Sequence, residues 1–135
     1  MPFELHPRLA KGCHPLGMRN GCHVLLKDNA CFPWMLVVPE TEEEDLHLLE
    51  KAQYDEVMLT VRDVSKFVSE HFHPEKLNVA CIGNIVRQMH IHIVGRSQND
   101  PAWPETVWAC DARKTYQQEQ VRSIREAARS FLHLH

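Results

Sequence analysis

Two histidines, His90 and His92, have the side-chain type and the spacing for chemistry on a phosphate or a metal ion. Residues 88–93 alternate polar and apolar side chains, which predicts a β-strand with Gln88 and both histidines on one open face. Residues two apart in a strand lie about 6.6–7 Å apart, so both imidazoles could reach one ligand. Imidazole also exchanges protons near neutral pH. The apolar residues of the opposite face, predicted to enter the core, are Met89, Ile91 and Ile93.

Taken alone, this histidine pair also fits a solvated strand face or a metal site. The chain has ten histidines among 135 residues, so close pairs on a solvated strand also arise by chance. A small metal-binding β protein would use both imidazoles as ligands, but metal sites usually need three or four ligands. A zinc site at Cys13 and His14, or at Cys22 and His23, lacks the paired-ligand spacing. We therefore predict no metal and no cofactor.

Length and composition describe one globular domain. The 135 residues are 44% hydrophobic and 24% charged, with a net charge of −3 when the histidines are neutral. An acidic chain offers no basic field for a nucleic acid polymer, although a local positive site could still bind a small anion. The five cysteines form no Cys-x-x-Cys pair, and the first residues lack the apolar run of a signal peptide. We therefore expect reduced cysteines, a cytoplasmic location and no membrane association.

The pattern of apolar residues predicts two pairs of antiparallel strands. Residues 21–28 and 34–39 indicate a hairpin with a long connection. Residues 77–83 and 87–95 indicate two neighbouring strands joined by a tight turn. Residues 1–20 are rich in proline and glycine, so we expect mostly loop there.

The same pattern predicts a long helix and a terminal helix. Thr41 and Glu44 match a capping box, which would begin a short helix before a long one over residues 51–72. Residues 114–132 have helical spacing of apolar side chains. We expect the tail, residues 133–135, to be disordered or helix-terminal.

With these elements in this order, the chain resembles the histidine triad (HIT) superfamily of nucleotide hydrolases and transferases. The family signature is His-x-His-x-His-x-x with apolar residues at x, and residues 88–94 match it with Gln88 in place of the first histidine. The order of the matching pieces, over roughly residues 3–109, is more specific than the motif alone. The other pieces are Asp28-Asn29 and Leu36-Val37-Val38-Pro39, Asn84, and, as in a bacterial branch, Ala102-Trp103-Pro104 and Val107-Trp108.

The resemblance implies an α+β, HIT-like fold, in which an antiparallel sheet of about five strands carries a long central helix and a C-terminal helix. Residues 1–109 would form the HIT-like domain. Residues 110–135 would form a C-terminal helical extension packed on the same domain. The resemblance also implies a homodimer whose sheets meet across the long helices or the strand edges.

The resemblance further implies that the protein hydrolyses or transfers the nucleotidyl group of a phosphoester, phosphoramidate or dinucleoside polyphosphate. His90 matches the nucleophile, which would form a nucleotidyl-histidine while its other ring nitrogen bonds a backbone carbonyl. His92 matches the third histidine and would bond a phosphate oxygen or protonate the leaving group. Asn84 would donate to the phosphate. Asp28 and Asn29 would bond the ribose hydroxyls.

Two departures from the family pattern define the main alternative. Gln88, which we place among the catalytic residues, cannot carry the charge of an imidazolium. Trp34 stands where many members carry a further histidine in the hairpin. A nucleotide-binding module with little or no turnover is therefore the alternative to an enzyme. Arg96 would be a surface charge or a phosphate contact, and we expect the three tryptophans to serve packing or a dimer interface.

Overall fold

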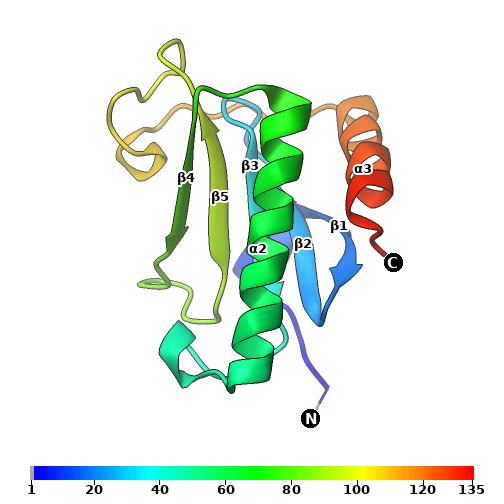
Figure 1. The fold of residues 1–135 in the computed structure, drawn as a ribbon. Coiled ribbons are helices and arrows are strands. Elements are labelled where there is room, and N and C mark those ends of the chain that lie inside the picture. The colour runs from blue at the N-terminus through cyan, green and yellow to red at the C-terminus, as the bar shows by residue number, and fades with distance from the viewer. Residues whose placement is uncertain (1) are drawn as a thin grey trace.

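The computed structural model describes residues 2–135 and contains one five-stranded antiparallel sheet (Figure 1). Its strand order is β1-β2-β3-β5-β4, so β5 lies inside the sheet while β1 and β4 form its edges. The strands are β1 (Cys13–Arg19), β2 (Cys22–Lys27), β3 (Trp34–Pro39), β4 (Lys76–Cys81) and β5 (Ile91–Arg96). This arrangement confirms the predicted α+β class with about five strands.

Both predicted strand pairs are confirmed. β2 pairs with β3, and β4 pairs with β5, each in antiparallel register. β3 also pairs with β5, which places Leu36 opposite His92. β5 begins later than predicted, since residues 82–90 lie outside the regular strands. The residues of the predicted core face, Met89, Ile91 and Ile93, are all buried in the core.

Helix α2 (Lys51–Phe72) has the bounds of the predicted long helix, and it packs on β3 and β5. Its buried residues recur at the spacing of one helix face, and they are Val57, Thr60, Val61, Val64, Phe67 and Val68. The predicted short helix before it is a single 3-10 turn at Leu46–Leu48. The predicted capping box is wrong, because Thr41 accepts a hydrogen bond from the Glu43 N–H in a non-helical segment and Glu44 pairs with Arg87.

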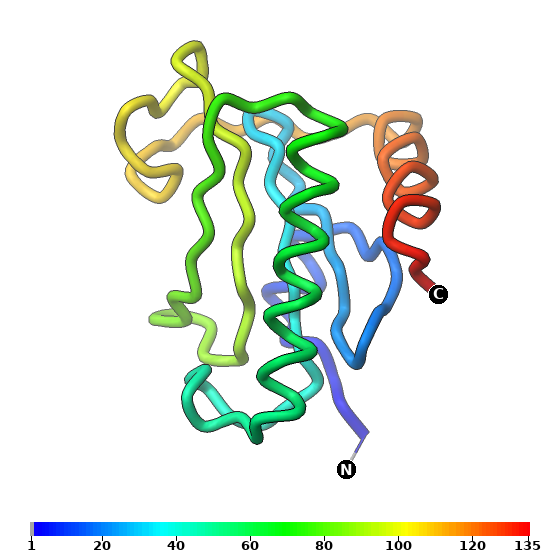
Figure 2. Tube along the Cα trace, viewed as in Figure 1, coloured from blue at the N-terminus to red at the C-terminus, as the bar shows by residue number. Residues whose placement is uncertain are grey.

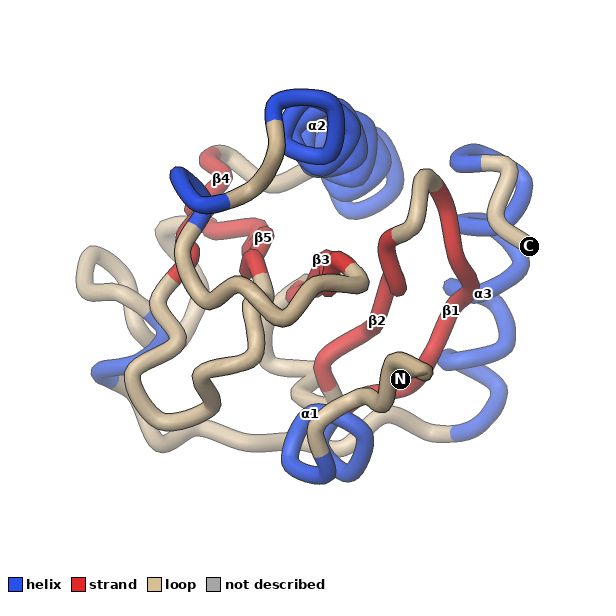
Figure 3. The backbone as a smooth tube through the Cα atoms, turned by 90° about the horizontal axis from the view of Figure 1, so that it is seen from below, coloured by secondary structure: helices blue, strands red, loops and turns tan. Residues whose placement is uncertain are grey.

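Two apolar clusters cover the two faces of the sheet. On one face, Met35 and Ile93 pack with residues of α2 such as Val64. On the other face, Leu36 and Val94 pack with residues of α1 and of the segment that follows β5. Figure 3 shows α2 on one side of the sheet and α1 on the other. All six residues of β5 are therefore buried. Within residues 2–135, no helix is long and apolar enough to cross a membrane.

The expectation of mostly loop over residues 1–20 is wrong for residues 7–19, while residues 2–6 lack regular structure and Met1 lies outside the described residues. Helix α1 (Pro7–Gly12) has proline in its first turn, and the ring of His6 accepts an N–H of that turn. β1 then pairs with β2 as an edge strand. The proline and glycine of this strand occur where the β1–β2 register shifts, and such irregularities are common at sheet edges.

The C-terminal end of the chain covers β1. Helix α3 (Gln118–Leu132) packs beside this strand, and two of its arginine side chains donate to β1 carbonyls. The tail then pairs with β1 through two backbone hydrogen bonds between Met18 and His135, 2.9 and 3.1 Å long (Figure 2). Gly17 has a φ of +149°, and a Cβ there would meet Leu134 at 2.8 Å. The tail is therefore ordered, and it protects the β1 edge of the sheet.

A buried ion pair fastens the segment that follows β5. Arg96 is 2% exposed and donates to both carboxylate oxygens of Asp100, at 2.7 and 3.1 Å. It also donates to the Asn78 side chain and to the Glu105 carbonyl. Burial alone would raise the pKa of Asp100, but hydrogen bonds from Arg96 and from three backbone N–H groups lower it to about 2. Arg96 is therefore a buried structural residue, neither a surface charge nor a phosphate contact.

Asp100→Asn should lower the free energy of unfolding by about 3–5 kcal/mol, because it leaves the buried guanidinium of Arg96 without a charged partner. The lowered pKa means that the charge of Asp100 stabilises the fold above about pH 4, and that this contribution is lost as the pH falls toward 2. Urea denaturation at pH 7 and pH 3 measures both effects. The control is Asp55→Asn, in the exposed pair with Lys51, which should leave the midpoint unchanged. Equal effects of the two substitutions would contradict the prediction.

Candidate active site

A cavity of about 630 Å³ lies beside β5, and His90 and His92 both line it. Each of the two side chains is 7% exposed, so they do not lie on the open face that the sequence predicted. Their ring centroids are 4.8 Å apart. The other residues that line this histidine cavity are Arg8, Leu9, Lys27, Leu36, Ile82, Gly83, Asn84, Ile85, Val86, Trp108 and Arg113.

The tautomer of His90 follows from its hydrogen bond to the backbone. Nδ1 of His90 lies 2.7 Å from the carbonyl oxygen of Gln88. A carbonyl only accepts, so Nδ1 donates its proton to that oxygen. The neutral ring then has its unshared electron pair on Nε2. A ring in this state can act as a nucleophile through Nε2.

The tautomer of His92 is the opposite one. Nε1 of Trp34 donates to Nδ1 of His92 at 3.0 Å. An indole N–H cannot accept, so the proton of the neutral His92 ring lies on Nε2. Burial, followed by the charges of His90 and Lys27, lowers the pKa of His92 to about 3. Near pH 7, His92 is therefore a neutral ring that offers an N–H donor.

Two indole rings enclose His92. Trp108 lies edge-to-face against His92, with ring centroids 4.9 Å apart, and against Trp34 at 5.8 Å. Trp108 belongs to a 3-10 turn (Val107–Ala109) in the segment that follows β5. Both tryptophans pack, as expected, but the polar contact of Trp34 with a histidine was missed from the sequence.

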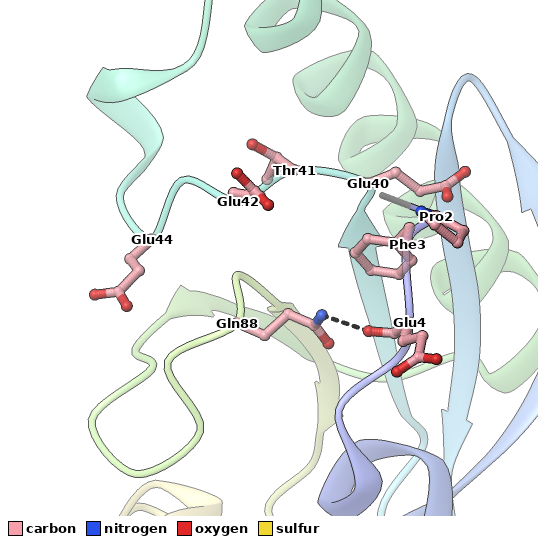
Figure 4. Close-up of a pocket in the computed structure, with 8 residues that line it drawn as sticks. All are labelled: Pro2, Phe3, Glu4, Glu40, Thr41, Glu42, Glu44 and Gln88. Carbon is pink, nitrogen blue, oxygen red and sulfur yellow. Dashed lines mark hydrogen bonds between the residues drawn. The ribbon is translucent and has the colours of Figure 1, made fainter.

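The histidine cavity is cationic. Arg8, Lys27 and Arg113 line it, and no described aspartate or glutamate does. None of the three takes part in an ion pair found among residues 2–135. A second cavity, of about 870 Å³, has the opposite character (Figure 4). Its lining includes four glutamates, Glu4, Glu40, Glu42 and Glu44. These charges favour an anionic ligand in the histidine cavity and disfavour it in the acidic one.

The side chain of Gln88 lines the acidic cavity and not the histidine cavity. Its Nε2 donates to the Glu4 carbonyl at 2.9 Å, a contact drawn in Figure 4, and its Oε1 accepts from the His6 N–H at 2.8 Å. Gln88 precedes the first residue of β5, so strand alternation does not govern its direction. The structure thus brings only the backbone carbonyl of Gln88 to His90.

The remaining predicted site residues divide into two groups. Asn84 is exposed and lines the histidine cavity, so its contact with a phosphate stays a prediction. Asp28 and Asn29 do not line that cavity. Their side chains accept from or donate to backbone groups of residues 112–116 at 3.0–3.3 Å, and the N–H of Tyr116 lowers the pKa of Asp28. Their contact with a ribose also stays a prediction, and one that these bonds do not favour.

Sequence reasoning missed the three cations because each comes from a different part of the chain and none belongs to a motif. Arg8 had one local signal, since a proline directly before it is typical of a first helical turn. In the described part of the chain, no group of three or more His, Cys, Asp or Glu could hold a metal ion. The five cysteines are all free.

Trp34→Phe should raise the pKa of His92 by about one unit, because the indole N–H that opposes protonation of Nδ1 is removed. The shift follows from a hydrogen bond worth about 1 kcal/mol and about 1.36 kcal/mol per pKa unit. Nitrogen-15 NMR titration of the histidine rings measures this pKa, and it should find the proton of wild-type His92 on Nε2. Since burial lowers the pKa of His92 in the folded state, the unfolded state binds a proton more readily. The free energy of unfolding therefore decreases as the pH falls from about 6.5 toward 3. That loss should be smaller in the variant.

The matched control is Trp108→Phe, which keeps an aromatic ring against His92 and removes no hydrogen bond to it. The pKa of His92 should stay close to the wild-type value in this variant. An equal rise in both variants would mean that aromatic packing, and not the Trp34 N–H, sets the protonation of His92.

The family model of the HIT domain matches residues 12–99. A search of curated proteins finds no match to the sequence.

Several solved structures share the whole fold. A histidine triad protein from Marinobacter aquaeolei VT8 is 35% identical, with 97% of this chain and 96% of that chain covered and a TM-score of 0.91. One from Bradyrhizobium japonicum is 31% identical, covers 95% and 96% of the two chains, and has a TM-score of 0.91. A third, from Sinorhizobium meliloti 1021, is 25% identical over 98% and 97%, with a TM-score of 0.90. The HIT-like fold is thereby confirmed, and the chain belongs to the histidine triad (HIT) family.

Proposed function

We propose that the protein is a nucleotide hydrolase or nucleotidyl transferase that acts through a nucleotidyl-histidine on His90. The observation that carries this proposal is the pair of opposite tautomers in one cavity. His90 has an electron pair on Nε2, and His92 has an N–H at the same ring position. Three cationic side chains, Arg8, Lys27 and Arg113, line the same cavity, which suits a phosphate. The substrate is a nucleotide phosphoester, a phosphoramidate or a dinucleoside polyphosphate.

In the first step, Nε2 of His90 attacks the α-phosphorus, and the bond to the leaving group breaks with its electron pair on that group. The resulting imidazolium keeps its Nδ1–H on the Gln88 carbonyl, which stabilises the positive charge. His92 donates its Nε2–H to a non-bridging phosphate oxygen. In hydrolysis, water then attacks the phosphorus, releases a nucleoside monophosphate and a proton, and restores His90.

The neutral state of His92 favours phosphate binding over protonation of the leaving group. Because the pKa of His92 is lowered to about 3, almost no His92 is in the imidazolium form near pH 7, and only that form is acidic enough to protonate a leaving group. A phosphate oxyanion departs without a proton, whereas an amine needs one. This favours substrates whose leaving group is itself a phosphate.

His90→Ala should lower the turnover of diadenosine tetraphosphate and of an adenosine phosphoramidate by about 10⁴-fold or more, because it removes the nucleophile. Quenching of the wild type in alkaline denaturant, which preserves the acid-labile P–N bond, followed by mass spectrometry at neutral or alkaline pH, should find adenylate on the peptide that contains His90. The control is His71→Ala, which removes an exposed histidine of α2 that stacks on Phe67 and lies outside the cavity. Tight nucleotide binding without product from either substrate would overturn the enzyme and leave the nucleotide-binding module.

We also propose that two copies of the chain pair through the edge strand β4. The other edge strand, β1, is covered by the C-terminal tail. β4 exposes Val79 at 48%, and Ile82 directly after the strand is 43% exposed. An uncovered edge with apolar side chains is a template for pairing with a second chain. This arrangement would match the homodimer that the family resemblance implies.

Val79→Lys should convert the dimer to a monomer, because it places a charge where the second chain would pack. Light scattering during size-exclusion chromatography measures the mass. Phe131→Lys is the control, since Phe131 is 40% exposed on α3, which packs beside β1 at the opposite edge of the sheet. A monomeric wild type would contradict the proposal, as would a Val79→Lys dimer of unchanged stability.

A further inference from the structure

The amide of Gln88 joins the start of β5 to the first residues of the chain. It donates to the Glu4 carbonyl and accepts from the His6 N–H, which lie 84 and 82 positions away in the sequence. One side chain thus satisfies one acceptor and one donor of the backbone of residues 2–6, which we call the N-terminal arm (Figure 4). A second point of attachment is Phe3, whose ring stacks on His23 with centroids 5.1 Å apart.

The arm leads directly into α1 and into the wall of the histidine cavity. His6, whose N–H bonds Gln88, also accepts the Arg8 N–H on its ring Nδ1 at 3.1 Å. Leu9 is buried and lines the cavity, and Arg8 is exposed at the same wall. The position of the arm therefore determines where α1 begins, and with it where the Arg8 guanidinium lies.

We propose that Gln88 is a positioning residue whose amide holds the N-terminal arm, so that α1 keeps Arg8 at the cavity wall as an anion-binding group. This inference rests on the proposed function for the anionic nature of the ligand. Arg8 lines the same cavity as Lys27 and Arg113 and has no acidic partner among the ion pairs of residues 2–135. Its charge is thus available to a ligand, provided that α1 stays in place.

The chemistry of the contact explains why an amide suits this position. An amide offers one donor and one acceptor on a planar group, as the Glu4 carbonyl and the His6 N–H require. Glutamate would keep only the acceptor, and it would add a negative charge to a cavity that already has four glutamates. Methionine matches the length of glutamine and makes neither hydrogen bond.

The test uses four variants of the full chain: Gln88→Met, Arg8→Met, the double variant, and Lys11→Met as a control for charge in α1, since Lys11 does not line the cavity. Calorimetry gives the Kd for adenosine monophosphate and for inorganic pyrophosphate. Steady-state kinetics on diadenosine tetraphosphate gives KM and kcat separately. Amide hydrogen exchange at His6 reports on the arm itself.

Gln88→Met and Arg8→Met should each raise Kd and KM by about tenfold, which corresponds to the loss of one anion contact of about 1.4 kcal/mol. Each should leave kcat within about twofold, because neither side chain touches the reacting atoms. The double variant should be no worse than either single one, since the two residues act through one contact. His6 should exchange faster in Gln88→Met and not in Arg8→Met. Lys11→Met should behave as the wild type.

Three results would overturn the inference. Faster exchange at His6 without a change in Kd would make the contact of Gln88 purely structural. A fall in kcat with an unchanged KM would place Gln88 at the reacting atoms. Additive losses in the double variant would make the two residues independent. Should the wild type turn over no nucleotide, the proposed function fails, and the pyrophosphate Kd of the same four variants still decides the role of Gln88.

Discussion

The burial of β5 on both faces is the constraint on which the rest of the structure depends. With one solvated face, His90 and His92 would be ordinary surface imidazoles. Here α2 covers one face of the sheet, and α1 with the segment after β5 covers the other. Because the two rings lose most of their water, the nitrogen of each ring that faces away from the cavity, Nδ1, requires a protein partner. The bonds to the Gln88 carbonyl and to the Trp34 indole meet that requirement, and they also set the chemistry of each ring.

The covering segment depends in turn on Arg96, at the end of the same face of β5. Side chains two apart in a strand share a face, so Arg96 continues the row that begins with His92 and Val94. Its bonds to Asp100 fix where the chain turns after the strand. That segment then brings Trp108 against His92. Stability and site geometry are therefore connected along one strand face, since the buried ion pair holds the layer that excludes water from the imidazoles.

Sequence patterns predicted the elements whose two faces differ in polarity, which are α2, the hairpin of β2 and β3, and the core side of β5. The order of these elements also carried the family resemblance. The sequence pattern does not predict β1 and α1, because proline and glycine are typical of loops, whereas here Pro7 begins a helix and Gly17 makes room for the tail. The direction of the Gln88 side chain could not be predicted, since both of its partners lie more than 80 positions away. No local pattern encodes such a contact.

A sequence presents His90 and His92 as two equal imidazoles, and the fold makes them unequal. The difference comes from one partner that can only accept and one that can only donate, so each ring is held in the tautomer that the other lacks. The partner of His90 is a backbone carbonyl, which every residue at position 88 would supply. A glutamine there removes an imidazole from the family signature, yet it leaves the backbone hydrogen bond that fixes the tautomer of His90. The side chain of Gln88 is then available for the N-terminal arm, and the mechanism proposed for His90 does not require an imidazole at position 88.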